Sequence, residues 1–191
     1  MKPCFPNPTC GHKGQRHRTL LGMVRHYILH YRPRAQHELE SFSRQPFEEA
    51  LERAALAIDE DKKRFSHQTR LRGSPLRKAR NILLHAAGKL RRCGSFDQLH
   101  NVIREHVNGI RGLAELYYYD TALRIGARLS LMPKRVYLHR GTRDGARALG
   151  LDWRADSLDP CALPKELAVL EPYEIEDFLC IYKAWLRPEM R

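Results

Sequence analysis

Apolar side chains recur along the chain at the three- and four-residue spacing of amphipathic helices. The spacing predicts helices from Thr19 to Pro33, from Pro46 to about residue 58, and from Ser74 to Gly94. Proline suits the first turn of a helix and glycine suits the position after its end, so these residues mark the boundaries. The expected buried faces are Leu20, Val24 and Tyr27; Phe47, Ala50, Leu51 and Ala54; and Leu76, Ala79, Leu83 and Leu90.

The second half of the chain continues the helical pattern. Ser95 and Gln98 form a capping-box pattern that starts a helix. Further helices are predicted from Glu115 to Leu129, from Thr142 to Gly150, and from Pro172 onward. In the last helix, the acidic residues are expected to face water; they are Glu174, Glu176 and Asp177. Because no run alternates between apolar and polar residues, no sheet is expected, and the predicted fold class is an all-α, multi-helix globular domain.

The pattern also suggests how the chain is organised. Residues 1–44 are predicted to form an irregular segment containing Cys and His, followed by a basic helix. Residues 45–191 are predicted to form the helical core, which ends in an acidic helix.

Charge changes this picture, because the chain has a formal net charge of +12 that is unevenly distributed. Residues 62–92 hold 11 Lys or Arg and no acid, whereas residues 152–191 hold 9 acids and 5 bases. A concentrated positive charge attracts a polyanion and releases its counterions, which favours nucleic acid as a partner. Two alternatives remain open: a solvated basic surface kept for solubility, and a basic face that docks on an acidic protein partner.

The location of the protein is expected to be cytoplasmic or nucleoid-associated. The sequence contains no apolar stretch long enough for a membrane helix or a secretory signal, so no membrane association is predicted. The five cysteines have no regular spacing, which argues against a disulfide framework. No P-loop or dinucleotide-binding fingerprint is present.

A glycine-containing turn separates two predicted helices between Val107 and Ala122. Its residues Ile110, Arg111, Gly112 and Leu113 resemble the helix-hairpin-helix motif, although Ala114 stands where the second glycine normally lies. In such a turn, successive backbone N–H groups point toward a DNA phosphate. The open alternative is an ordinary helical connection with no ligand.

The resemblance extends to the helix-hairpin-helix superfamily of DNA glycosylases related to endonuclease III. That family carries a V-D-T-H segment about two dozen residues after the hairpin, with an arginine shortly afterwards, and this chain reads V-Y-L-H-R-G-T-R from Val136 to Arg143. Val136 and His139 match, and Arg140 or Arg143 stands for the arginine. The resemblance implies a helical core over residues 46–182 and binding to DNA.

The departures from the family bear on catalysis. Tyr137 falls at the position of the catalytic carboxylate, and Glu115 or Leu116 falls near that of the lysine of bifunctional members. Only Cys161 and Cys180 remain after the core, so no iron–sulfur cluster is expected. The sequence therefore predicts DNA binding without classical glycosylase chemistry. The alternative is an active glycosylase, lyase or nuclease with a displaced carboxylate, for which Asp144 is the candidate.

The predicted DNA-binding residues comprise the turn, the arginines and histidine around it, and basic residues of the Ser74–Gly94 helix. They are Gly109, Arg111, Gly112, Leu113, Ala114, Arg124, Lys134, His139, Arg140, Arg143, Arg77, Lys78 and Arg80.

A second type of site is suggested near the N-terminus. Four residues with metal-ligand side chains lie within fourteen positions, namely Cys4, Cys10, His12 and His17. Thiolate and imidazole are the usual ligands of tetrahedral zinc, so we expect one zinc ion here. The alternative is a loose terminus in which these residues occur together by chance.

Overall fold

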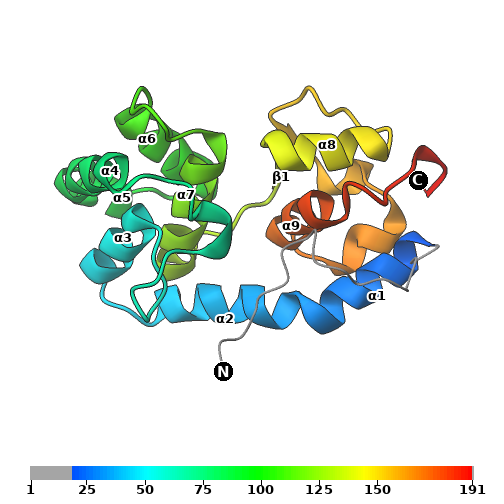
Figure 1. Ribbon diagram of the computed structural model, residues 1–191, viewed down its shortest axis with the longest axis horizontal. Helices are drawn as coiled ribbons and strands as arrows, with labels where there is room; N and C mark the ends of the chain where they lie inside the picture. Colours follow the sequence, from blue (N-terminus) through cyan, green and yellow to red (C-terminus); the bar gives the residue numbers. More distant parts are fainter. Residues whose placement is uncertain (1–18, 191) are drawn as a thin grey trace.

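The computed structural model describes residues 19–190, which fold into helices joined by loops of varied length, with one pair of two-residue strands (Figure 1). The all-α expectation is confirmed. Within this range, no helix is both long enough and apolar enough to cross a membrane. The α-helices are α1 (Leu20–His30), α2 (Arg32–Ser43), α3 (Phe47–Leu56), α4 (Gly73–His85), α5 (Ala87–Arg91), α6 (Phe96–Val107), α7 (Glu115–Leu129), α8 (Arg140–Ala148) and α9 (Pro172–Tyr182).

Two separate hydrophobic cores divide the described chain into two lobes. The buried core residues of the middle lobe all lie between Phe42 and Ile125. The flanking lobe is built from two distant segments, because the core residues Leu20–Tyr27 pack with those of 136–186. In Figure 1 the middle lobe lies on the left, the flanking lobe on the right, and α2 runs beneath both. The two cores are therefore not divided at residue 44, where the sequence suggested a boundary.

In the middle lobe, helices pair along their apolar faces, α3 with α4 and α6 with α7. The start of α6 has the predicted Ser95 cap, since Ser95 Oγ accepts from the Gln98 N–H at 3.2 Å. The return bond is displaced by one residue from a capping box, because Gln98 Oε1 accepts from the N–H of Gly94 at 2.8 Å and not from that of Ser95. The helix predicted to run from Ser74 to Gly94 is interrupted at Ala86, which separates α4 from α5.

In the flanking lobe, α8 packs closely on α9. A Cβ at Gly145 would lie 2.2 Å from the Leu179 carbonyl oxygen, so only glycine permits this approach. The short antiparallel strands β1 (Val136–Tyr137) and β2 (Ser157–Leu158) were not predicted. They pair Tyr137 with Ser157 and fix Tyr137 between the lobes.

Two expectations need correction: the role of Pro33 and the exposure of the acidic residues of α9. Pro33 does not itself end the first helix, which stops at His30, but lies in the first turn of α2, where its missing N–H leaves no bond unmade. The acids of α9 do not all face water, because Glu174 and Glu176 are only 1% and 7% exposed. The expectation that these acids face water was wrong because this side of α9 packs within and between the lobes.

Candidate nucleic-acid interface

The turn between α6 and α7, residues 108–114, is held by its own apolar side chains. Ile110 and Leu113 are buried, and their N–H groups donate to the carbonyls of Val107 and Ile110 at 3.2 and 3.0 Å. The Tyr118 hydroxyl donates to the Leu113 carbonyl at 3.0 Å. The turn is thereby fixed from its inner side.

The outer side of the turn is open. Gly109 and Gly112 have φ angles of +84° and +96°, a backbone region that side chains with a Cβ rarely adopt. A Cβ at Gly112 would meet only the Pro75 Cγ, at 3.9 Å. Within residues 19–190, the N–H groups of Arg111, Gly112 and Ala114 have no hydrogen-bond acceptor. Three N–H groups within four consecutive residues therefore remain available to an anion.

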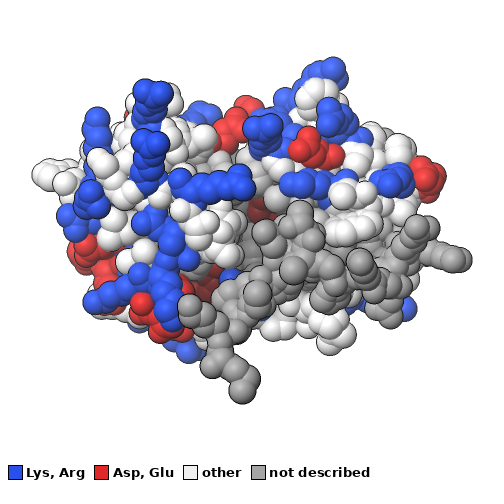
Figure 2. All heavy atoms as spheres, in the orientation of Figure 1, with Lys and Arg blue, Asp and Glu red and all other residues white. Residues whose placement is uncertain are grey.

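The start of α4 lies against this turn through Pro75 and is surrounded by positive charge. The Arg77 guanidinium folds back over Gly73 at the first position of α4. Figure 2 shows many Lys and Arg side chains gathered over the middle lobe. Five basic residues near the start of α4 and the turn are exposed and have no ion pair within the described chain: Arg70, Arg72, Arg77, Lys78 and Arg111. We call them the basic cluster.

Several predicted DNA-binding residues outside this cluster have other roles. Lys134 and Arg140 are exposed. Arg80 forms an ion pair with Glu52 at 2.7 Å. Arg143 is partly buried and donates to the carbonyls of Trp153 and Ala155 at 3.0 and 2.7 Å, so it anchors the loop after α8.

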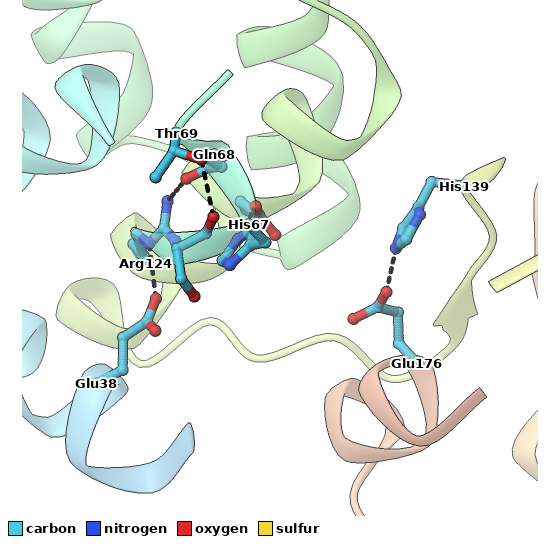
Figure 3. A network of polar contacts seen from close by, with 9 residues as sticks. Glu38, His67, Gln68, Thr69, Arg124, His139 and Glu176 are labelled. Carbon is cyan, nitrogen blue, oxygen red and sulfur yellow. Dashed lines mark hydrogen bonds and ion pairs between the residues drawn. The ribbon is translucent and has the colours of Figure 1, made fainter. Parts of the chain in front are cut away.

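Arg124 is not a DNA contact, because it is buried inside the middle lobe with 2% of its surface exposed. Its guanidinium donates to Glu38 at 2.8 Å and to Gln68 at 2.9 Å (Figure 3). It also lies 3.8 Å from the centre of the Phe65 ring. The sequence did not reveal this, since an arginine on an amphipathic helix usually points to solvent.

His139 is also buried, which excludes a direct contact with DNA in this conformation. Its Nε2 hydrogen-bonds to Glu176 of α9 (Figure 3). His139 therefore links the segment before α8 to α9 within the flanking lobe.

A pocket of about 320 Å³ lies between the lobes, next to the start of α7. Asp97, Glu115 and Asp156 supply its carboxylates, and the Tyr137 hydroxyl donates to Asp97. Asp144 does not line this pocket but contacts Arg147 at 3.3 Å. Asp97 was missed because nothing in its sequence context distinguishes it from other first-turn acids.

Aromatic and titratable side chains form one wall of the same pocket. His100 stacks on Phe96, and its ring centre lies 4.8 Å from that of Tyr137. Burial, together with the nearby charge of Arg104, lowers the pKa of His100 to about 4. Tyr119 is buried, and its hydroxyl has no hydrogen-bond partner among the described residues.

The predicted zinc ligands Cys4, Cys10, His12 and His17 lie outside the described residues. Within residues 19–190, no group of three or more His, Cys, Asp or Glu side chains is arranged to hold a metal ion.

Comparison of the chain with protein-family models, with curated proteins and with solved structures found no significant match.

Proposed function

We propose that the protein binds duplex DNA through the 108–114 turn and the basic cluster. The observation that supports this most directly is the combination of unpaired N–H groups at Arg111, Gly112 and Ala114 with exposed cations around the adjoining start of α4. Backbone N–H groups donate to phosphate oxygens without contacting the bases, so binding depends little on the DNA sequence. Glu115 follows the turn, but its carboxylate lies 3.8 Å from Arg143, which partly offsets its repulsion of a phosphate.

The test is a DNA titration with the Gly112→Val variant. A β-branched residue strains the positive φ and covers the donors, so affinity should fall at least tenfold while the helices remain folded. The matched control is Gly150→Val, which places the same strain at a φ of +69° in the flanking lobe. Unchanged affinity in Gly112→Val would show that the turn is only a helical connection.

Salt dependence provides a second measure of the same interface. Each neutralised phosphate contributes a slope of about 0.9 to the fall of log affinity with log salt. Replacing Arg77 with Ala should reduce that slope by about 1 and weaken binding to all sequences similarly. Affinity that is equal at low and high salt would contradict a phosphate-based interface.

A second candidate function is base excision in the pocket between the lobes, and the observation that favours it is the Asp97 carboxylate bound to Tyr137. In this proposal, the role of the Asp97 carboxylate is to stabilise positive charge on a sugar whose base is leaving. A base-release assay on damaged duplexes, run with wild type and Asp97→Asn, tests it. Release by wild type that Asp97→Asn abolishes would support an enzyme, and no release by wild type would leave DNA binding alone.

A further inference from the structure

The boundary between the lobes carries titratable side chains from both sides. From the middle lobe, His67 Nε2 hydrogen-bonds to Asp120 Oδ2 at 2.9 Å. From the flanking lobe, His139 hydrogen-bonds to Glu176, and Asp177 accepts from the Tyr27 hydroxyl at 3.0 Å. The two groups meet at the boundary, where the ring of Tyr119, next to Asp120 on α7, lies 6.4 Å from the ring of His139. Asp120 therefore interacts electrostatically with both His139 and Glu176.

We call His67, Asp120, His139, Glu176 and Asp177 the boundary cluster. Other polar side chains surround it, and they come from the helices and the strand that pack against it. Arg124 is the nearest permanent cation, but it is already paired with Glu38 of α2. The Tyr119 hydroxyl is buried against Glu176 and Asp120 without a partner in the described chain. Further charged or titratable neighbours are Tyr137 of β1, Glu115 of α7, His26 and Tyr31 of α1, Arg32 of α2, Glu174, Cys180 and Tyr182 of α9, and Lys183 after it.

The charge of the cluster depends on its protons. With both imidazoles protonated, they offset two of the three carboxylates, Asp120, Glu176 and Asp177. When the imidazoles are neutral and the carboxylates ionised, like charges face one another across the boundary in surroundings that screen them poorly. Since water solvates such charges better than the interior does, separation of the lobes then becomes more favourable.

The surroundings shift the pKa of each member of the cluster. Partial burial disfavours the imidazolium of His67, but the hydrogen bond and charge of Asp120 raise its pKa above the ordinary value. Burial and the charge of Glu176 raise the pKa of Asp177 to about 7. Burial likewise raises the pKa of Glu176, although contact with His139 opposes this. Burial raises the pKa of Asp120, but contact with His67 outweighs this and lowers it. Asp120 is therefore the one carboxylate of the cluster that favours its deprotonated form.

We propose that the lobe boundary is a proton-controlled hinge, in which protons on the cluster hold the two lobes together and their loss loosens the contact. The lobes are joined covalently only by α2 and residues 130–135, and the buried residues of the two cores form separate sets. Opening therefore leaves both buried cores in place, but it separates Tyr137 from the middle-lobe core and from Asp97. The hinge is independent of DNA binding.

Small-angle X-ray scattering of the full chain between pH 5.5 and 8.5 tests the hinge. The radius of gyration should increase with pH, because the ratio of open to closed molecules grows by up to about tenfold per pH unit for each linked proton. A radius that stays constant over this range would overturn the proposal.

Variants identify the groups responsible. Replacing Glu176 with Gln and Asp177 with Asn together should abolish the increase, whereas Asp152→Asn, an exposed acid of the same lobe, should retain it. His67→Gln provides a milder change, because this side chain is 46% exposed and its loss leaves both cores intact. It should shift the midpoint of the transition to lower pH. An unshifted midpoint in His67→Gln, or an unchanged transition in the double variant, would contradict the hinge.

Discussion

Buried charge is stabilised differently inside the middle lobe and at the lobe boundary. Arg124 is a permanent cation with a carboxylate, an amide and an aromatic ring around it, so its charge is matched by direct partners within the described chain. Glu176 and Asp177 instead face Asp120, and their balance depends on two imidazoles. The comparison indicates that the middle lobe is built for a fixed structure, whereas the boundary responds to conditions.

The largest effect is expected when the fixed pairing is broken. Replacing Arg124 with Met leaves Glu38 and Gln68 without their cation and donor, and should lower the free energy of unfolding by about 3–5 kcal/mol. Urea unfolding measures this. Arg104→Met, at an exposed position, is the control and should change stability little. Equal losses in both variants would mean that the Arg124 network adds no specific stability.

The pH response of the middle lobe should have the opposite sign to that of the boundary. The pKa of His100 is lowered to about 4 by burial, so the folded state favours the neutral ring. The neutral His100 ring contributes to the free energy of unfolding above the unfolded pKa of about 6.5, and this contribution is lost as pH falls toward 4. The loss amounts to at most about 3 kcal/mol before solvent screening. Unfolding of His100→Gln at pH 4.5 and 7 should show a smaller difference than wild type. An equal difference would assign the acid sensitivity elsewhere.

Close helix packing can be compared between the lobes with one substitution in each. Alanine at Gly145 would place its Cβ 2.2 Å from the Leu179 carbonyl oxygen, and alanine at Gly126 would lie 2.4 Å from that of Leu131. Because backbone must move in both cases, each variant should lose about 1–3 kcal/mol in thermal or urea unfolding. Gly88→Ala, whose Cβ would meet only the Arg92 side chain at 3.6 Å, should be neutral or stabilising. If all three variants were destabilised, the cause would be a general cost of replacing glycine by alanine and not close packing at Gly145 and Gly126.

The smallest effect is expected for paired surface charge on α4. Arg80 is bound to Glu52 at the surface, and such pairs contribute about 0.2–1 kcal/mol, so Arg80→Ala should barely change stability. Its DNA affinity should also fall less than that of Arg77→Ala, since Arg77 has no ion pair within the described residues. A larger loss of affinity in Arg80→Ala would shift the proposed interface away from the start of α4.

The sequence predicted those features of the fold that depend on interactions between residues close together in the chain. The apolar spacing, the Ser95 cap and the proline positions specified most of the helices, because each acts within a few residues. It missed α2, whose sequence is polar and carries Pro33 in its first turn. That helix is stabilised by packing on α7, which a local pattern does not contain.

The candidate sites divide in the same way. The glycine turn was recognisable because positive φ angles require particular residues. The burial of Arg124 and Glu176 was not, since each is surrounded by residues from distant segments, such as Glu38 for Arg124 and His139 for Glu176. Asp97 and Tyr137 meet only because β1 returns beside α6.

The discontinuous flanking lobe also determines the order in which the chain can fold during synthesis. The middle lobe is one uninterrupted segment, so its core can form as soon as residue 129 has left the ribosome. Helix α1 is made first, yet its buried face packs against residues up to Leu186 and stays exposed until these are synthesised. Slow translation after residue 129 should therefore prolong the exposure of Met23, Val24 and Tyr27, and with it the time in which the nascent chain can aggregate.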